Sequence, residues 1–321
     1  MVHRKSGGKV VSMKNVLVTG AGGFIGLALS RYLADKGYSV VALVREGRVP
    51  TELTNHPQIT VVPVDIRDED EMKRVGELYR PEWVFHLAAS NIQSGITADP
   101  RTLIDTNILG TRAVLEMAKH SGSQACVTMG SFLEYGQRET ALREDMVCAP
   151  PELYSVSKLA GTLLAQSYAR EGTLPHIVSF RLFTPYGPGI QEGRLVREII
   201  TRALRGEPLL LTRPTVTRDF IFIDDIVRVL EEAAEQSERH MGQIYNLGSG
   251  EKTTLEYLAN TVLNLTGSLS EIEWGGFGNV SYDTDLWQAD MKKTYSAFSW
   301  RPETSLTEGV EKTISWVKSL S

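Results

Sequence analysis

The fold is decided by the stretch Val16-Leu17-Val18-Thr19-Gly20-Ala21-Gly22-Gly23-Phe24-Ile25-Gly26. A short aliphatic run leads into closely spaced glycines, and an amphipathic helical pattern follows them. Backbone without Cβ atoms turns tightly and approaches a pyrophosphate closely, and the charge of a pyrophosphate is favoured at a helix N-terminus. Because the glycines stand between a predicted strand and a predicted helix, we expect this loop to bind a dinucleotide; the alternative is a turn with a structural role only. The residues expected at the dinucleotide are Gly20, Gly23, Phe24, Ile25 and Gly26.

Beyond this loop, short β-branched runs alternate with amphipathic helical patterns. Such alternation is typical of a parallel sheet that is covered by helices on both faces. We therefore predict an α/β fold with a doubly wound, Rossmann-like parallel sheet. The predicted strands are 16–19, 40–44, 59–64, 83–87, 125–129 and 177–181, and helices between them include 69–79, 106–119 and 155–170.

The pattern changes after Arg181, where prolines and glycines cluster at residues 184–189. A smaller α/β region, residues 182–321, is predicted to bind substrate over the carboxyl ends of the sheet. We expect the dinucleotide-binding domain to cover residues 14–181 and to include parts of 224–248, and residues 1–13 to form a mobile extension. Helices of the second region are predicted at 195–205, 225–236, 255–266 and 308–318, and strands at 209–211 and 219–223.

Composition excludes several classes of protein. The 321 residues carry a formal net charge of −5, so no broad basic surface for nucleic acid is expected. The two cysteines, Cys126 and Cys148, make no disulfide framework and lack the spacing of a zinc site, which indicates a cytoplasmic protein with no metal. No apolar run approaches the ~18 residues of a membrane helix, and the N-terminus has no apolar signal-peptide core. Membrane and secreted classes are therefore excluded.

The end of the second predicted strand indicates which dinucleotide binds. Sites specific for NAD commonly place Asp or Glu there, to bond the ribose 2′-hydroxyl. Here the strand ends in Arg45, and Arg48 follows. A guanidinium pairs with a 2′-phosphate through charge-assisted hydrogen bonds. We therefore expect NADP(H) as the cofactor, with NAD(H) as the alternative if Arg45 is only a solvated residue.

Tyr154 and Lys158 stand four residues apart, on one face of a predicted helix. A nearby ammonium group stabilises a phenolate, which prepares the tyrosine for proton transfer. Tyr32 and Lys36 have the same spacing. Because they follow the glycine loop, away from the strand ends where such sheets bind ligands, we expect that second pair to be ordinary helix surface.

Ser131 follows the fifth predicted strand, at the carboxyl edge of the sheet. There its hydroxyl would hold a carbonyl or alkoxide oxygen of the substrate, while Tyr154 exchanges its proton and Lys158 binds the nicotinamide ribose. The alternative for Ser131 is a serine that caps a turn. For His86, at the end of the fourth predicted strand, we expect a buried structural role.

A series of motifs follows in chain order: the glycine loop, Phe85-His86-Leu87-Ala88-Ala89, Ser131 with Tyr135-Gly136, Tyr154 with Lys158, Arg218-Asp219-Phe220, Asp224-Asp225 and Tyr245-Asn246-Leu247-Gly248. Together they resemble the extended short-chain dehydrogenase/reductases, the group of NAD-dependent epimerases and dehydratases that act mostly on nucleotide sugars. The resemblance extends from Lys14 to the C-terminus. It implies hydride transfer between a nicotinamide and a sugar carbon, with Ser131, Tyr154 and Lys158 in the catalytic roles given above.

The resemblance also implies further contacts. Arg218 would meet the diphosphate of the substrate, and Thr184 stands where relatives commonly carry an asparagine that touches the sugar nucleotide. Relatives often dimerise through two helices, here 106–119 and 155–170, so a homodimer is expected; the alternative is that residues such as Ala113 and Leu163 face their own sheet. Asp65 and Ile66 would bracket the adenine, and Leu87, Ala88 and Ala89 would line the cofactor.

Two departures from the family pattern bear on function, one on the reaction and one on the substrate. Dehydratases of this group carry an Asp-Glu pair directly after the catalytic hydroxyl, whereas this chain has Phe132 and Leu133, which carry no proton. A 4,6-dehydratase is therefore disfavoured. Glu134 is one residue further on, and in an extended segment its side chain would point to the other side. Where the family carries a second arginine for the phosphates, this chain has Val280, so either Arg218 works with other basic residues such as Arg194 or Arg213, or the substrate carries less negative charge than a nucleotide diphosphate sugar.

Arg45 then favours a reductase, because cells usually keep NADPH for reductions. We predict the NADP(H)-dependent reduction of a 4-keto group on a nucleotide-activated deoxysugar, with Tyr154 as the proton donor. The alternatives are an NAD-dependent nucleotide-sugar 4-epimerase, a reductase of a carbonyl substrate without a nucleotide, and a non-catalytic dinucleotide-binding sensor.

Overall fold

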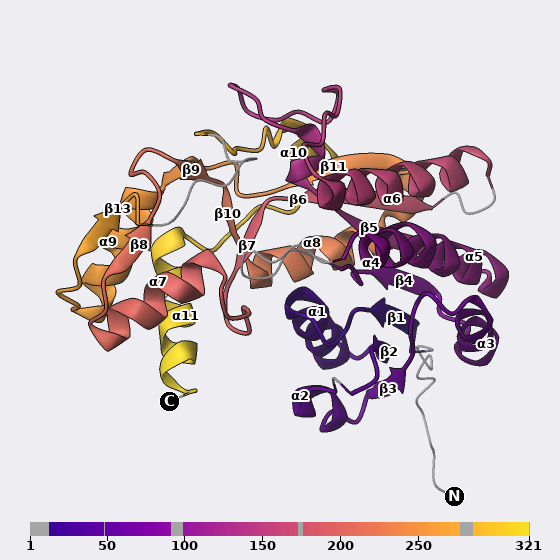
Figure 1. Ribbon diagram of the computed structural model, residues 1–321. Helices are drawn as coiled ribbons and strands as arrows, with labels where there is room; N and C mark the ends of the chain where they lie inside the picture. The colour runs from indigo at the N-terminus through magenta and orange to yellow at the C-terminus, as the bar shows by residue number, and fades with distance from the viewer. Residues whose placement is uncertain (1–12, 48, 91–98, 173–175, 277–284, 321) are drawn as a thin grey trace, which may run out of the picture.

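The computed structural model describes residues 13–47, 49–90, 99–172, 176–276 and 285–320. Within them, seven parallel strands form one sheet in the order β11-β6-β5-β4-β1-β2-β3 (Figure 1). The predicted doubly wound α/β fold is confirmed, because the strand order reverses between β1 and β4, which is where such sheets bind ligands. The strands are β1 (Asn15–Thr19), β2 (Ser39–Val44), β3 (Ile59–Pro63), β4 (Trp83–His86), β5 (Ala125–Ser131), β6 (Ile177–Leu182) and β11 (Gln243–Leu247).

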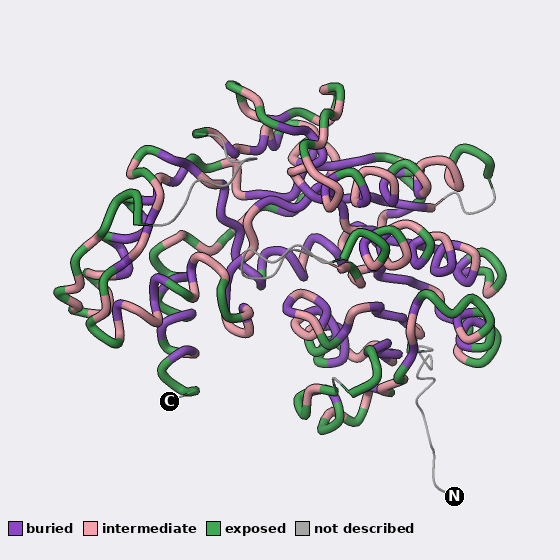
Figure 2. The backbone as a smooth tube through the Cα atoms, viewed as in Figure 1, coloured by how far each residue is buried: buried purple, intermediate pink, exposed green. Residues whose placement is uncertain are grey.

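Helices cover both faces of this sheet, and its strands are mostly buried (Figure 2). Val16 and Val18 of β1 belong to the core under α1 (Phe24–Asp35) and α8 (Ile223–Glu235). Leu17, between them, belongs to the opposite core. Burial on both faces explains why the strands are nearly continuous aliphatic runs. The opposite face is covered by α3 (Glu69–Tyr79), α5 (Thr111–Ser121) and α6 (Leu153–Arg170), and α5 is preceded by α4 (Pro100–Ile104) and the π-helical turn η1 (Asp105–Gly110).

Most of the chain beyond β6 forms a second lobe. Its helices α7 (Leu195–Arg205), α9 (Leu255–Thr266) and α11 (Leu306–Lys318) pack against one another (Figure 1). Strand β11 and helix α8 instead return to the first lobe, where β11 pairs with β6. Short strand pairs complete the second lobe: β10 (Phe220–Phe222) with β7 (Thr184–Tyr186), β12 (Thr253–Thr254) with β9 (Thr217–Arg218), and β13 (Ile272–Trp274) with β8 (Leu209–Leu211).

Three local expectations differ from the structure. Strand β5 continues two residues beyond the predicted end and includes Ser131. The proline- and glycine-rich stretch contains β7, which pairs with β10. Helix α8 begins directly after β10, so Asp225 lies in its first turn, where the buried carboxylate accepts hydrogen bonds from the backbone N–H groups of Glu303 (3.0 Å) and Thr304 (3.2 Å).

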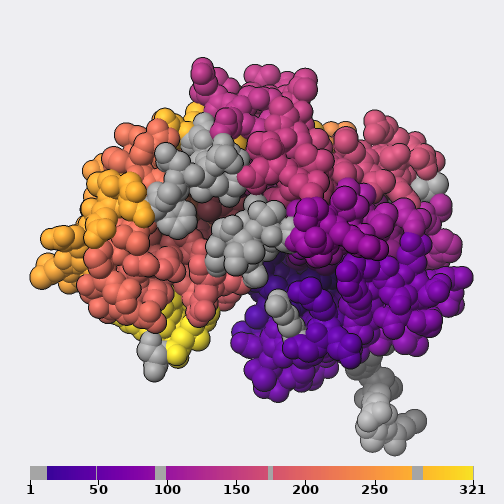
Figure 3. All heavy atoms as spheres, viewed as in Figure 1, coloured from indigo at the N-terminus to yellow at the C-terminus, as the bar shows by residue number. Residues whose placement is uncertain are grey.

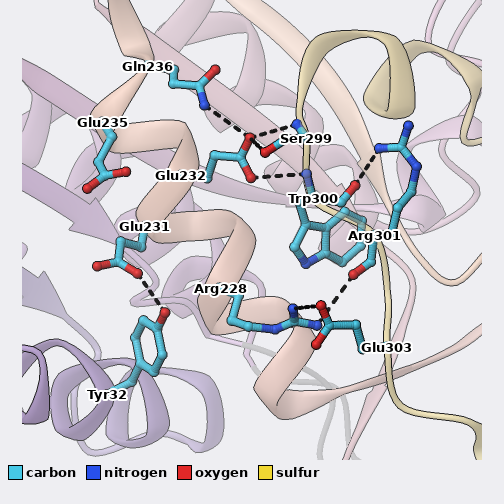
Figure 4. Close-up of a pocket in the computed structure, with 10 residues that line it drawn as sticks. All are labelled: Tyr32, Arg228, Glu231, Glu232, Glu235, Gln236, Ser299, Trp300, Arg301 and Glu303. Atoms are coloured by element: carbon cyan, nitrogen blue, oxygen red, sulfur yellow. Dashed lines mark hydrogen bonds and ion pairs between the residues drawn. The ribbon is translucent and has the colours of Figure 1, made fainter.

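Helix α8 joins the two lobes through its polar face (Figure 4). Glu231 accepts a hydrogen bond from the Tyr32 hydroxyl of α1 (2.6 Å) and lies 3.6 Å from the Lys36 ammonium. Glu232 accepts a hydrogen bond from the backbone N–H of Ser299 (2.7 Å). A cavity of about 530 Å³ lies among these side chains. The Tyr32–Lys36 pair therefore makes a contact between helices and lies away from Ser131 and Tyr154, whose side chains do not line this cavity.

Candidate active site

The glycine loop is held against the end of β4. Gly20 has a φ of +68°, and a Cβ atom there would lie 2.7 Å from the Ala88 backbone. A Cβ on Gly26 would clash with the Gly20 carbonyl oxygen. Helix α1 then begins at Phe24, after the N-cap residue Gly23, which makes no side-chain hydrogen bond to the helix. A close-packed glycine turn that ends in an uncapped helix N-terminus fits a pyrophosphate.

Thr19 positions the segment that is expected to line the cofactor. Its Oγ1 accepts hydrogen bonds from the backbone N–H groups of Leu87 (3.2 Å) and Ala88 (3.1 Å), and lies 2.9 Å from His86 Nδ1. His86 Nε2 lies 2.9 Å from Thr111 Oγ1. Burial, and then the charge of Lys158, lower the pKa of His86 to about 3. The imidazole is therefore neutral, and its two ring nitrogens bridge the hydroxyls of Thr19 and Thr111.

Ser131 is the last residue of β5 and also caps the turn that follows. Its Oγ accepts a hydrogen bond from the Leu133 backbone N–H (3.2 Å), and its own backbone N–H donates to Glu134 Oε1 (2.9 Å). These two bonds form a capping box for the 3₁₀ turn η2 (Phe132–Tyr135). The capping role that the sequence left as an alternative is present. The hydroxyl still has a proton to donate at the carboxyl edge of the sheet.

Tyr154 and Lys158 lie in the first turns of α6, which packs against β5 and η2. Lys158 lines a small cavity of about 10 Å³ together with His86 and Thr128. Burial lowers the pKa of Lys158 to about 8, and the charge of Glu134 acts in the opposite direction. A cavity of this size and polarity holds about one water molecule. Lys158 is thus half-buried beside β5, the strand that carries Ser131.

Asn107, which sequence reasoning missed, fixes this turn of α6. Its Nδ2 donates to the Ser157 Oγ (2.9 Å) and to the Ser90 carbonyl oxygen (2.9 Å), and its Oδ1 accepts from the Ser90 N–H (2.8 Å). Ser157 stands between Tyr154 and Lys158. The π-helical geometry of η1, which recurs at functional sites, places this amide there. An isolated asparagine in a helical pattern gives no sequence signal for such a role.

The residues expected near the adenine lie beyond the ends of β2 and β3. Asp65 accepts hydrogen bonds from Arg67 Nε at 2.9 and 3.0 Å, and these bonds lower the pKa of Asp65. Ile66 is buried, and a Cβ atom on Gly110 would lie 2.8 Å from its Cδ1. Arg45 is exposed. Arg45 and Arg67, the second of which the sequence analysis missed, therefore lie just beyond the ends of the neighbouring strands β2 and β3.

The expected substrate residues lie on the short strands of the second lobe. Arg218 ends β9 and donates from Nη1 to a backbone carbonyl (2.8 Å), and the Thr184 N–H donates to the Asp219 carbonyl oxygen (2.9 Å). The buried Asp219 carboxylate accepts from the backbone N–H groups of Ser249 (2.6 Å) and Ala289 (3.0 Å). Burial raises the pKa of Asp219 to about 6, against the effect of these bonds. Asp219 thereby fixes the loops around Arg218 and Thr184.

The position after Ser131 is aromatic. Phe132 stacks on Phe183, with ring centroids 5.4 Å apart, and meets Trp287 edge-on at 4.8 Å. Leu133 is a partly buried apolar residue. The segment is a 3₁₀ turn, whereas an extended one was expected, and it places Glu134 in the core, fully buried. No acid therefore occupies the two positions where dehydratases of this kind carry one.

Several other features bear on the site. The face of the molecule is hollowed where the N-terminal elements meet the second lobe (Figure 3).

Within the described ranges, His, Cys, Asp and Glu side chains form no group of three or more that could hold a metal ion, and no helix is both long and apolar enough to cross a membrane. Residues 1–12, most of the expected N-terminal extension, lie outside the described residues, as do Arg48 and Val280.

Residues 16–248 match the model of the NAD dependent epimerase/dehydratase family, which is more than half of the chain. The chain is 28% identical to dTDP-glucose 4,6-dehydratase of Haemophilus influenzae, over 95% of this chain and 98% of that protein. It is also 28% identical to UDP-glucuronate 4-epimerase of Thermodesulfobacterium geofontis, over 94% of this chain and 95% of that protein.

Solved structures share the whole fold. UDP-glucose 4-epimerase from Thermotoga maritima, with UDP-glucose, superposes with a TM-score of 0.86 at 27% identity, over 96% of this chain and 100% of that chain. UDP-glucuronic acid 4-epimerase from Bacillus cereus, in complex with UDP-glucuronic acid and NAD, gives the same TM-score of 0.86, identity of 27% and coverages of 96% and 100%.

Proposed function

Because the chain belongs to the NAD-dependent epimerase/dehydratase family, and is thus an enzyme of the extended short-chain dehydrogenase type that uses a nicotinamide dinucleotide, we propose that it reduces the 4-keto group of a nucleotide-activated deoxysugar with NADP(H). The observation that carries the proposal is the set of contacts and residues next to Ser131. The turn of α6 with Tyr154 and Lys158 is tied to the end of β5, and no acid follows Ser131 at the next two positions.

In the proposed mechanism, a bound nicotinamide supplies the hydride. The Ser131 hydroxyl donates a hydrogen bond to the substrate carbonyl oxygen and orients it. Tyr154 gives its proton to this oxygen as the alkoxide forms, and the Lys158 ammonium stabilises the phenolate that results. Asn107 keeps the turn of α6 in place, and neutral His86 leaves Lys158 as the cation beside the tyrosine.

The proposal that this enzyme eliminates no water rests on two side chains. Elimination of water from a sugar needs a base that takes a proton from one carbon and an acid that gives a proton to the hydroxyl leaving the neighbouring carbon. Phe132 and Leu133 supply neither, and Glu134 is paired with Arg181 in the core at 2.8 Å. We therefore propose hydride and proton transfer at one carbon, without loss of water.

The preference for NADP(H) rests on Arg45 and Arg67. Arg45 is exposed just beyond β2, and Arg67 is 44% exposed with Asp65 beside it. An exposed guanidinium in this place is suited to a ribose 2′-phosphate.

A second candidate is an NAD-dependent nucleotide-sugar 4-epimerase. It is favoured by the similarity to UDP-glucuronate 4-epimerase of Thermodesulfobacterium geofontis and by the likeness to an epimerase structure that contains NAD. The same serine, tyrosine and lysine serve both reactions, because epimerisation at C4 is an oxidation followed by a reduction at one carbon.

We also propose that residues 14–181, with α8 and β11, bind the dinucleotide, and that the rest of 182–321 binds the nucleotide sugar. The protein is proposed to form a homodimer through η1 and α6, where Leu109 (46%), Val156 (42%) and Leu163 (48%) are exposed apolar side chains. Ala113 does not belong to this surface, since it is buried against its own sheet.

The test of the reaction uses the purified protein with NADPH or NADH and two sets of nucleotide sugars, one that carries a 4-keto-6-deoxy sugar and one that carries a sugar with a 4-hydroxyl group. Loss of nicotinamide absorbance in proportion to substrate supports the reductase. Tightly retained NAD, with interconversion of 4-epimers and no net cofactor consumption, identifies the epimerase instead. Cofactor binding with neither reaction would contradict both.

A further inference from the structure

Glu134 is fully buried directly behind Ser131. Its Oε1 accepts hydrogen bonds from the Ser131 backbone N–H (2.9 Å) and from the Thr162 hydroxyl of α6 (3.0 Å). Its Oε2 accepts from Arg181 Nε of β6 (2.8 Å). One carboxylate therefore joins the strand end that carries Ser131, the helix that carries Tyr154 and Lys158, and the neighbouring strand.

The packing around this carboxylate is tight. A Cβ atom on Gly130 would lie 2.9 Å from Thr162 Oγ1 and would clash with Glu134 Oε1, so β5 touches the carboxylate directly. Arg181 is only 3% exposed, and its guanidinium also lies 4.4 Å from the centre of the Tyr135 ring. Glu134 therefore has a fixed place and a fixed partner.

The charge of Glu134 needs an explanation that its hydrogen bonds do not give. A neutral glutamine would accept the bonds from Ser131 and Thr162 equally well and would require no buried arginine. Placing two charges in the core carries a desolvation cost that their attraction often only offsets. The capping of a short turn therefore does not by itself account for this buried anion.

Lys158 is a second cation near this anion, besides Arg181. Lys158 and Thr162 are four residues apart on one face of α6, and Thr162 contacts the carboxylate. His86, which lines the same cavity as Lys158, is neutral, and Arg181 is paired with Glu134. Burial lowers the pKa of Lys158, and the Glu134 charge raises it.

We propose that Glu134 is a positioning residue for the reaction: it fixes Ser131 through the backbone and keeps the Lys158 ammonium charged. Glu134 does not touch the substrate. Glu134 thus acts on the reaction through Lys158 from within the core, whereas the two residues before it, Phe132 and Leu133, are apolar. This role rests on the proposed function for what Lys158 does, but it is testable without any sugar substrate.

The main test compares wild type with the double variant Glu134→Gln/Arg181→Met. This variant removes the charges of Glu134 and Arg181 together, so neither of these two is left without the other, and it keeps an oxygen that accepts from Ser131 and Thr162. Affinity for NADPH and for NADH is measured by fluorescence from about pH 6 to about pH 10. Affinity is expected to fall as Lys158 loses its proton, and in the variant this fall is expected at least about half a pH unit lower.

Thr162→Val is the matched control, because it removes a hydrogen bond to the carboxylate and keeps the charge. Its pH dependence is expected to match that of wild type. Superimposable curves for wild type and a folded double variant would overturn the proposal. If the double variant does not fold, the isosteric single variant Glu134→Gln replaces it in the same comparison.

A thermal double-mutant cycle decides the question without any cofactor. Lys158→Met is introduced into wild type and into the Glu134→Gln/Arg181→Met background, and the change in Tm is measured at neutral pH. We expect a larger rise in Tm in the variant background, since the lysine there has lost its anion. Equal changes in Tm would exclude the coupling. Failure of the wild-type protein to bind either cofactor, with coupling still present in this cycle, would contradict the proposed function but not the role of Glu134.

Discussion

The side-chain amide of Asn107 lies 2.9 Å from the Ser157 hydroxyl, and this bond ties the π-helical turn to the turn of α6 between Tyr154 and Lys158. Asn107 is 3% exposed and also bonds both backbone groups of Ser90. Two segments far apart in sequence therefore meet at one amide, directly behind the proposed proton donor.

Asn107→Ala is expected to lower both stability and turnover. The change leaves polar groups of the half-buried Ser90 and the buried Ser157 without this partner, and each buried group left unsatisfied costs about 1–3 kcal/mol. The turn of α6 then moves relative to the cofactor, so kcat is expected to fall more than KM changes. Thermal unfolding and steady-state kinetics measure the two effects. Asn264→Ala, at an exposed position of α9, is the matched control and should change neither.

Tyr154→Phe is expected to reduce kcat by about 10²–10⁴-fold, because general acid catalysis by a positioned side chain contributes roughly this much. Cofactor affinity should change little, since only one hydroxyl is removed. Tyr32→Phe is a close control: Tyr32 has the same spacing to a lysine, but its hydroxyl bonds Glu231 between two helices. It should lower stability modestly and retain turnover. A fully active Tyr154→Phe protein would contradict the assignment of the acid.

The main elements could be predicted from the sequence because their signals are local. The strands of a sheet buried on both faces are aliphatic runs, and their ends were placed within about two residues of those observed. The glycine loop is equally local, because Gly20 needs a positive φ and close approach to the Ala88 backbone. Helices 69–79 and 255–266 were predicted at the residues where α3 and α9 begin and end.

The interior of the site could not be predicted, because its contacts join distant residues. Nothing near Glu134 in the sequence indicates that Arg181 lies opposite it, and an extended segment was expected where η2 turns the side chain inward. The position of Asn107 depends on a π-helical turn, which has no sequence signature. Strand β7 was missed because Pro185 is rare in a strand, although an edge position in a two-stranded pair accepts it.

Lys158→Met is expected to stabilise the cofactor-free protein while it abolishes turnover. The pKa of Lys158 is lowered from 10.5 to about 8, so the folded state binds this proton less tightly than the unfolded state does. The free energy of unfolding therefore decreases as pH falls from about 10.5 to about 8, and below that the penalty stays near its full value, at most about 3 kcal/mol. Methionine removes the penalty and fills the same space.

The measurement for this variant is Tm as a function of pH, in cofactor-free protein. At neutral pH the variant should melt at a higher temperature than wild type, and the difference should shrink as pH rises above about 8. A variant that melts lower than wild type throughout this range would show that the lysine is not penalised by its burial.

Arg45→Ala is expected to weaken the binding of NADPH by about 10- to 100-fold, the usual effect of losing a charge-assisted hydrogen bond. NADH carries no 2′-phosphate, so its affinity should change little. Arg74→Ala, at an exposed position of α3, is the control and should leave both affinities unchanged. Equal effects of Arg45→Ala on the two cofactors would remove the main support for NADP(H) and would favour the NAD-dependent epimerase.

Leu163→Glu is expected to dissociate the proposed homodimer. Leu163 is 48% exposed on α6, with Val156 at 42% two helical turns earlier and Leu109 at 46% on η1. A carboxylate in the centre of an apolar interface would be desolvated without a partner, which strongly disfavours association. Leu78→Glu is the matched control, because Leu78 is 74% exposed on α3, outside these helices. Sedimentation velocity should show a dimer for wild type and Leu78→Glu, and a monomer for Leu163→Glu. A monomeric wild type would contradict the proposed interface, and a dimeric Leu163→Glu protein would place the interface elsewhere.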